Sequence, residues 1–86
     1  MSLAELKKQV GNKKLIAGTK RALKELKMGN VKTIFLASNC PKETKSEIET
    51  NARLNKTEVS QLDVNNEDLG VVIKKPFPVS IVFLLK

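Results

Sequence analysis

The chain has 86 residues, of which 41% are hydrophobic and only 3% aromatic, and its 16 basic and 9 acidic residues give a formal net charge of +7. A chain of this length buries enough apolar surface for one core, so we expect residues 1–86 to form a single domain. It has no histidine and one cysteine, which excludes an internal disulfide, a four-ligand zinc site and a cysteine–histidine catalytic pair. We therefore expect no enzyme activity, no small-molecule substrate, no metal and no cofactor.

All of the net charge lies in residues 1–32, which have nine basic and two acidic side chains, whereas residues 33–86 have seven of each. This distribution predicts a positive face that attracts a polyanion such as nucleic acid. A lysine-rich helix that serves only solubility is the alternative. The sequence shows neither a secretory leader nor the roughly 20 consecutive apolar residues of a membrane helix, so we expect a cytoplasmic protein without membrane contact.

The first half of the chain predicts two helices and two strands. Apolar residues recur at helical spacing over residues 3–10, after Ser2 as a potential N-cap. The segment "KLIAG" is typical of a brief strand. In "GTKRALKELKMG" the apolar and basic side chains fall on separate helical stripes, and Gly29 suits a left-handed C-cap. The segment "VKTIFLAS" indicates a central strand that is covered on both faces.

The second half continues the alternation of helices and strands. Thr44 and Glu47 form a capping-box pattern that opens a helix ending near Asn55. "TEVSQL" alternates as a strand, Asn65 is placed to cap a helix over "NNEDLGVVI", and residues 79–85 form the last strand. The pattern predicts an α/β fold, a three-layer α/β/α sandwich with a mixed, mostly parallel sheet of about four strands. Ligands in such folds bind at loops after strand ends, here "AGTK" and "ASNCPK".

The first of these loops opens the clearest helix. Gly18–Arg21 presents free backbone N–H groups at the positive end of that helix, beside the Lys20 and Arg21 side chains, which favours phosphate binding. Gly18 has no side chain, so a nucleic-acid backbone could approach closely. A simple turn would also explain this glycine.

The second loop and a later proline-rich loop supply further candidates. The Asn39 carboxamide has both the donor and the acceptor that discriminate a base edge, although it could instead cap the next segment. We expect Cys40 to be a small packed side chain; a thiol whose pKa is lowered by nearby basic groups is the alternative. In "KKPFP", Phe77 lies between two prolines, either exposed for packing on an unstacked base or inserted in the core.

Five segments of the chain together resemble one known family. "GTKRALKELKMGNVKTIFLASNCP", "KSEIE", "NARLNKTEV", "NNEDLG" and "KPFPV" follow each other as in the archaeal and eukaryotic eL-thirty family of large-subunit ribosomal proteins, part of the kink-turn RNA-binding superfamily. The resemblance covers about Leu6 to Leu85. It implies an α/β/α sandwich that binds a kink-turn or kink-loop, a sharply bent RNA element flanked by sheared G·A pairs. Bending opens the RNA major groove, so that side chains reach guanine edges hidden in regular A-form helix.

The resemblance also implies particular roles for residues of this chain. Lys20 and Asn39 would read guanine edges, Arg21 and Lys45 would contact phosphates, and the loop before the last strand would cover an extruded nucleotide. That family usually has a glycine where this chain has Lys74. The RNA-binding residues expected on this basis are Gly18, Thr19, Lys20, Arg21, Asn39, Lys45, Pro76, Phe77, Pro78 and Val79.

The sequence therefore predicts a non-catalytic, RNA-binding structural protein of the large ribosomal subunit. Its expected partners are a kink-turn in rRNA and neighbouring ribosomal proteins, in the cytoplasmic ribosome. One alternative is a stand-alone kink-turn protein of a guide-RNA particle or an mRNA regulator. The other is a protein-interaction module that has kept the fold without binding RNA.

Overall fold

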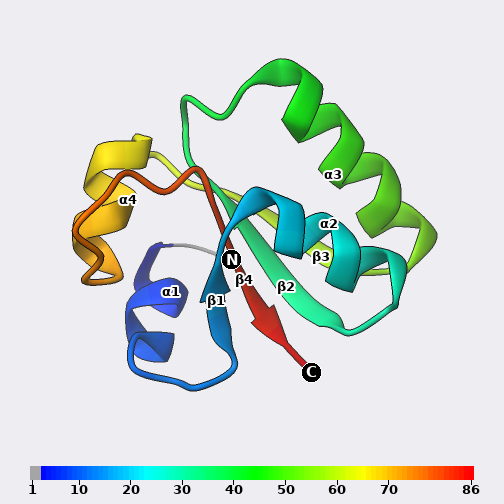
Figure 1. The fold of residues 1–86 in the computed structure, drawn as a ribbon, viewed down its shortest axis with the longest axis horizontal. Coiled ribbons are helices and arrows are strands. Elements are labelled where there is room, and N and C mark those ends of the chain that lie inside the picture. Colours follow the sequence, from blue (N-terminus) through cyan, green and yellow to red (C-terminus); the bar gives the residue numbers. More distant parts are fainter. Residues whose placement is uncertain (1–2) are drawn as a thin grey trace.

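Helices and strands alternate along the chain in the computed structural model, which describes residues 3–86 (Figure 1). The expected elements are all present, and Ser2, the N-cap expected for the first helix, lies outside the described residues. In chain order the elements are α1 (Leu3–Gln9), β1 (Leu15–Ala17), α2 (Thr19–Lys27), β2 (Val31–Leu36), α3 (Lys42–Leu54), β3 (Glu58–Gln61), α4 (Asn66–Val72) and β4 (Ile81–Leu85).

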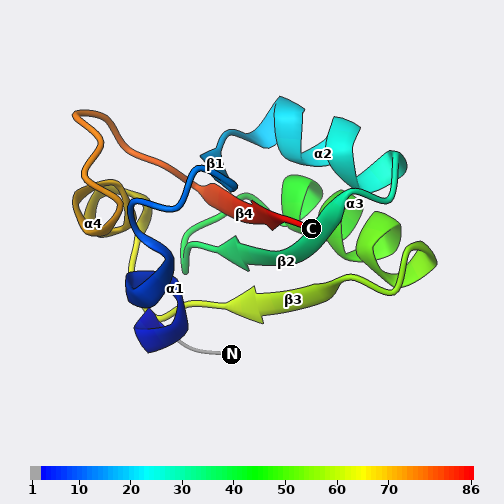
Figure 2. The ribbon, with the colours of Figure 1, turned by 90° about the horizontal axis from the view of Figure 1, so that it is seen from below.

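The four strands form one mixed sheet in the order β1-β4-β2-β3. β2 and β3 pair in parallel, whereas β4 pairs antiparallel with both of its neighbours, β1 and β2. Figure 2 shows the β4 arrow pointing opposite to those of β2 and β3. The α/β class and the mixed sheet are confirmed, but the expectation of mostly parallel pairing is wrong. β1, β2 and β3 run the same way, but β4 inserts between β1 and β2 in the reverse direction.

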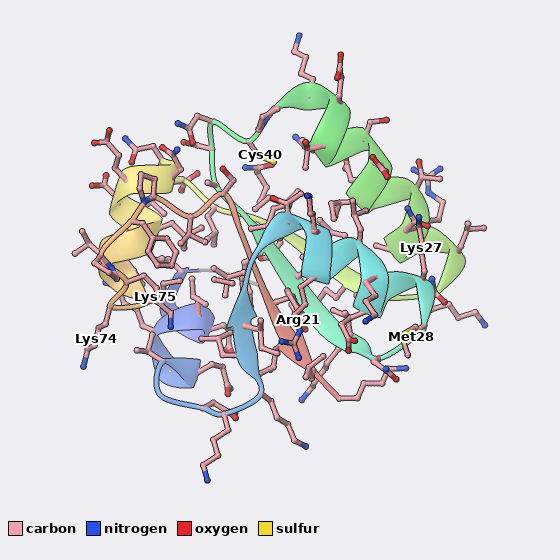
Figure 3. The ribbon with its side chains drawn as sticks, in the orientation of Figure 1. Arg21, Lys27, Met28, Cys40, Lys74 and Lys75 are labelled. Carbon is pink, nitrogen blue, oxygen red and sulfur yellow. The ribbon has the colours of Figure 1, made fainter. Side chains whose placement is uncertain are left out.

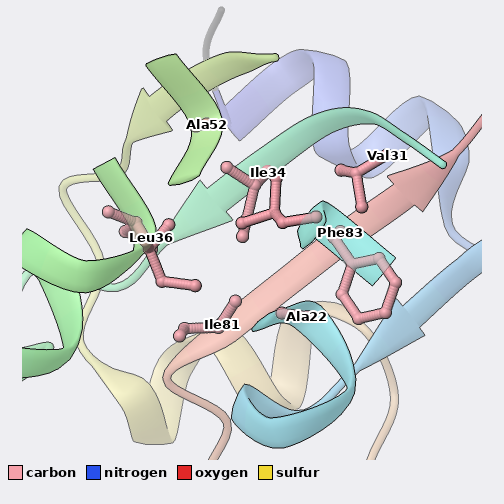
Figure 4. Packing of buried hydrophobic residues seen from close by; sticks show 9 residues of the cluster. Ala22, Val31, Ile34, Leu36, Ala52, Ile81 and Phe83 are labelled. Carbon is pink, nitrogen blue, oxygen red and sulfur yellow. The ribbon is translucent and has the colours of Figure 1, made fainter. Parts of the chain in front are cut away.

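Successive side chains of the central strands point to opposite faces of the sheet, because the strand period is two residues. Ile34 and Phe83 lie in a cluster with residues of α2 and α3, and Figure 4 shows their packing. Phe35 and Val82 lie in a second cluster, with residues of α1 and α4. Helices α2 and α3 therefore cover one face of the sheet, and α1 and α4 cover the other (Figure 1).

Helix α3 begins earlier than the capping-box pattern predicts. Its N-cap is Pro41, no side chain of the described residues caps it, and the Lys45 N–H donates to the Pro41 carbonyl at 2.9 Å. The prediction that Thr44 and Glu47 form a capping box at the helix start is therefore wrong, since both residues lie within the helix that follows Pro41. The fixed φ of proline suits a helix start and outweighs the weaker local signal of the box.

Helix α2 ends as expected, with Gly29 in the left-handed region at φ 74°. The Gly29 N–H donates to the Leu26 carbonyl at 3.0 Å and the Asn30 N–H to the Glu25 carbonyl at 3.0 Å. These two bonds are the Schellman motif, in which glycine at the left-handed position allows the last helical carbonyls to be satisfied.

Candidate nucleic-acid interface

Three segments that are distant in sequence meet at one end of the sheet (Figure 1). The Gly18 N–H donates to the Ile81 carbonyl at 3.1 Å, and the Ala37 N–H donates to the Ser80 carbonyl at 2.9 Å. The ends of β1 and β2 therefore flank the start of β4. This arrangement brings together the start of α2, the loop after β2 and the loop before β4, which contain the residues predicted to bind RNA except Lys45, which lies in α3.

The N-terminus of α2 has unused backbone donors. The first helical hydrogen bond runs from the Ala22 N–H to the Gly18 carbonyl at 3.1 Å, and no side chain among residues 3–86 caps this helix. Gly18 has φ 138° and ψ 136°, a backbone conformation that side-chain-bearing residues rarely adopt. The amides of residues 19–21 thus precede the helical ladder, at the positive end of the helix dipole, where an anion is favoured.

Basic side chains surround this helix terminus. Lys20 and Arg21 in the first turn are exposed, as are Lys24 and Lys27 farther along α2, and the first turn contains no acidic residue. Figure 3 shows Arg21 on α2 and Lys27 at the far end of the same helix. Four of the nine basic side chains of residues 1–32 therefore lie along α2, starting at the uncapped amides.

Asn39 lies in the loop after β2 and makes two hydrogen bonds to Asn66, the first residue of α4. The Asn66 N–H donates to Oδ1 of Asn39 at 2.9 Å, and Nδ2 of Asn39 donates to Oδ1 of Asn66 at 2.9 Å. Asn39 is exposed, and its carboxamide retains one further proton on Nδ2 and one further lone pair on Oδ1. The side chain is thus fixed by the fold and still offers a donor and an acceptor to a ligand.

The loop before β4 exposes an aromatic ring. Phe77 is 53% exposed, so the alternative in which its ring is inserted in the core is wrong. A surface groove of about 340 Å³ lies beside it, lined by Glu67, Val71, Lys75, Pro76, Phe77 and Pro78. Val79, in contrast, is only 5% exposed and packs with the cluster under α1 and α4. Its side chain therefore anchors the loop in the core, while the three preceding residues form the surface.

Gly70 allows α4 to pack directly against this loop. A Cβ atom at Gly70 would clash with the carbonyl oxygen of Phe77, so any larger residue would displace the loop. The Gly70 carbonyl also accepts a hydrogen bond from the Lys75 N–H at 2.8 Å. Sequence reasoning missed Gly70 and Asn66 as residues that position the site, although both lie in the segment "NNEDLG" that supports the family resemblance.

Lys74 ends α4 in the same way that Gly29 ends α2. Its φ is 61°, the Lys74 N–H donates to the Val71 carbonyl at 3.0 Å, and the Lys75 N–H completes the Schellman motif with Gly70. In Figure 3 the Lys74 side chain points away from the helix. Lys74 thus adopts the left-handed backbone conformation that glycine adopts with the least strain. For a lysine this conformation costs about 1 kcal/mol.

Cys40 follows Asn39 in the loop after β2, and Lys45 lies in the first turn of α3. Cys40 packs against the cluster under α2 and α3, and Figure 3 shows it on the connection between β2 and α3. Burial raises the pKa of the Cys40 thiol, and the nearby Lys45 ammonium lowers it by a smaller amount. The expectation of a small packed side chain is confirmed, and the alternative of a lowered pKa is wrong.

Residues 3–86 contain neither a candidate metal cluster nor a helix that could span a membrane. No group of three or more histidine, cysteine, aspartate or glutamate side chains in this range could hold a metal ion. No helix in the same range has both the length and the apolar character needed to cross a membrane.

Comparison with solved structures identifies the fold class. A protein of unknown function from Bacillus halodurans superposes with a TM-score of 0.84 at 20% identity, covering 98% of this chain and 83% of that one. The Giardia lamblia 15.5kD RNA binding protein gives a TM-score of 0.79 at 14% identity, covering 98% of this chain and 70% of that one. At such identities the likeness concerns the fold alone.

Sequence comparison defines the family. The model of the Ribosomal protein L7Ae/L30e/S12e/Gadd45 family matches residues 2–86, and the chain belongs to this family. The large ribosomal subunit protein eL30 of Methanococcus vannielii is 38% identical over 72 residues, spanning 84% of this chain and 69% of the relative. The protein of the same name from Methanocaldococcus jannaschii is also 38% identical over 72 residues, spanning 84% of this chain and 66% of the relative.

Proposed function

We propose that this protein is a non-catalytic, RNA-binding structural protein of the large ribosomal subunit that recognises a kink-turn or kink-loop in rRNA. Residues 1–86 act as one RNA-binding domain in the cytoplasmic ribosome, next to other ribosomal proteins. Family membership and the archaeal relatives named eL30 support this assignment. The observation that carries it is that the uncapped α2 N-terminus, the loop of Asn39 and the loop that exposes Phe77 all join the sheet at the start of β4.

The uncapped end of α2 would receive the RNA backbone. A phosphate placed there accepts hydrogen bonds from the amides of residues 19–21 and lies at the positive end of the helix dipole. Gly18 leaves open space beside these amides, since apart from Gly18 and its two chain neighbours no described residue lies within 4 Å of the position a Cβ would occupy. Arg21 and Lys45 contribute charge to further phosphates.

Lys20 and Asn39 would read the bases. Guanine presents two acceptors, O6 and N7, on its major-groove edge, which suit the Lys20 ammonium and the remaining Nδ2 proton of Asn39. Sheared G·A pairing uses the other edge of the guanine, so both acceptors remain available in a kink-turn. The three residues Pro76–Pro78 would cover an extruded nucleotide, with Val79 buried beneath them.

The two alternatives differ from this proposal in testable ways. A stand-alone kink-turn protein of a guide-RNA particle or an mRNA regulator would bind the same RNA element without sedimenting with ribosomal subunits. A protein-interaction module would bind a protein partner and no RNA at physiological salt. The basic surface around α2 favours RNA over the protein-interaction module.

The proposal is tested by titrating a kink-turn RNA and a plain duplex of equal length with the wild-type protein and with Asn39→Ala. The wild type should prefer the kink-turn, and Asn39→Ala should lose about 1 to 3 kcal/mol of binding free energy on that RNA, the scale of a specific base contact. Asn30→Ala, an exposed asparagine after α2, is the matched control and should bind as the wild type does. Equal affinity of the wild type for the two RNAs would contradict the proposal.

A further inference from the structure

Asn66 joins the two loops of the candidate interface through three hydrogen bonds. Its N–H donates to Oδ1 of Asn39, and its own Oδ1 accepts from Nδ2 of Asn39, both at 2.9 Å. Its carbonyl accepts from the Val79 N–H at 3.0 Å, which fixes the end of the Phe77 loop. One residue therefore sets the relative position of the carboxamide and the aromatic loop, although it lies 27 residues from the first and 13 residues from the second in sequence.

The backbone of Asn66 is itself held firmly. Oδ1 of Asn65 accepts a hydrogen bond from the Asp68 N–H at 2.8 Å and caps α4, and the Leu69 N–H donates to the Asn65 carbonyl at 2.8 Å. The Ser38 N–H, one residue before Asn39, donates to the Val64 carbonyl at 2.8 Å. Two successive residues of this loop, Ser38 and Asn39, are thus hydrogen-bonded to the segment that leads into α4, at Val64 and Asn66.

The pairing with Asn66 determines which way the Asn39 carboxamide faces. A free asparagine carboxamide rotates through a broad, nearly two-fold torsion, which exchanges the positions of oxygen and nitrogen. The Asn66 N–H requires an acceptor and the Asn66 Oδ1 requires a donor, so together they select one of the two orientations. In that orientation Oδ1 and one Nδ2 proton of Asn39 face α4, and the second Nδ2 proton is left for a ligand.

We propose that Asn66 is a positioning residue for base recognition, which orients Asn39 so that its remaining Nδ2 proton meets an acceptor on a guanine edge. This inference rests on the proposed function, because it assigns to Asn66 the selectivity of the RNA contact made by Asn39. The side chain of Asn66 is the specific element, since any residue at this position supplies the backbone N–H. Loss of its Oδ1 leaves the backbone N–H as the single restraint on the carboxamide, which loosens its orientation and weakens discrimination at the guanine that Asn39 contacts.

The experiment uses guanine analogues in a kink-turn RNA. Each guanine of the G·A pairs is replaced singly by 2-aminopurine, which lacks O6, or by 7-deazaguanine, which lacks N7; both keep the edge used in sheared pairing. The ratio of the dissociation constants for modified and unmodified RNA is the discrimination factor. For the wild type this factor should be about 5- to 100-fold at the guanine that Asn39 contacts. Asn39→Ala should reduce it to about one at that guanine.

Asn66→Ala should reduce the discrimination factor at the same guanine at least about threefold and leave the factor at the other guanine unchanged. Asn66→Asp restores an acceptor for Nδ2 of Asn39 and should recover the factor, while its negative charge weakens binding to all of the RNAs alike. Asn65→Ala is the matched control, because it removes the cap of α4 without touching Asn39 and should leave both factors at their wild-type values.

Each result separates the inference from the function on which it rests. A wild-type protein that binds kink-turn and duplex equally would overturn the proposed function. With the kink-turn preference present, a wild-type discrimination factor in Asn66→Ala would overturn only the positioning role. An equal loss of discrimination in Asn65→Ala would also overturn it, because a general loosening of α4 would then account for the effect.

Discussion

The N-termini of α2 and α4 are built in opposite ways. The α2 terminus begins at Gly18, has no side-chain cap among the described residues, and is followed by Lys20 and Arg21. The α4 terminus is capped by Asn65, which accepts from the Asp68 N–H, and has two acidic residues in its first turn. Both termini have the same positive end of a helix dipole, but two of the first α4 amides donate to side chains, whereas no side chain accepts from those of α2.

This contrast shows how a small fold separates stability from binding. At α4 the cap, the acidic first turn and the contact from Asn39 satisfy the helix terminus internally, so that it serves as a fixed support. At α2 the N-cap is Gly18, and forgoing a side-chain cap there costs only a few tenths of a kcal/mol. An uncapped and basic terminus is less stable alone, and a phosphate supplies the missing acceptors when it binds.

The largest expected effect comes from giving α2 the first turn of α4. Lys20→Glu combined with Arg21→Asp places acidic residues at the same two helix positions that Glu67 and Asp68 occupy in α4. Kink-turn affinity should fall at least 100-fold, about 2.7 kcal/mol, because anion binding and the local positive field are both removed. Thermal unfolding of the same variant should show equal or slightly higher stability.

The control for that exchange carries the same change in charge at the other end of the helix. Lys24→Glu with Lys27→Asp also lowers the net charge by four but leaves the first turn of α2 intact. Its loss of affinity should be smaller and should consist mainly of a shallower dependence on salt. A larger loss in this control than in the first-turn variant would refute a specific role for the α2 terminus.

Removing the cap of α4 should produce the reverse pattern. Asn65→Ala leaves the Asp68 N–H without its acceptor and should lower the free energy of unfolding by about 1 kcal/mol. Kink-turn affinity should stay near the wild-type value, because Asn66 and its bonds to Asn39 remain. Urea denaturation and RNA titration of one preparation measure both quantities. Reduced affinity with unchanged stability would contradict the supporting role of α4.

The smallest expected effects concern the other ends of the same two helices, which share one Schellman motif. Lys74→Gly should raise the free energy of unfolding by about 0.5 to 1 kcal/mol, because glycine adopts φ 61° without strain. Gly29→Lys should lower it by about 1 kcal/mol, since it introduces a side chain at φ 74°. Urea denaturation of the two variants compares them directly. A shift in the same direction for both would contradict the shared geometry.

Local signals in the sequence predict most of the fold. The apolar patterns indicate every helix and strand, Gly29 and Asn65 indicate helix termini, and the charge distribution indicates the positive surface on α2. These features depend on neighbouring residues, which is why one sequence is sufficient to predict them. The Thr44 capping box fails because Pro41, only three residues earlier, begins the helix first.

Features that depend on distant contacts could not be predicted. The insertion of β4 between β1 and β2 is set by pairing across the whole chain, and apolar patterning is the same for either strand direction. The partner of Asn39 lies 27 residues away. The clash that would arise at Gly70 involves a carbonyl seven residues on, in a loop whose path the pattern does not define. The RNA contacts of the candidate residues stay a prediction.

Amide hydrogen exchange with and without a kink-turn RNA, read residue by residue by NMR, tests the central claim most directly. In the free protein the amides of Thr19, Lys20 and Arg21 should exchange quickly, whereas the Asn66 and Asp68 amides should be protected by their bonds to Asn39 and Asn65. RNA should slow exchange at the three α2 amides strongly and leave the two α4 amides slow. Unchanged exchange at α2 in the presence of bound RNA would contradict the claim that its uncapped terminus receives a phosphate.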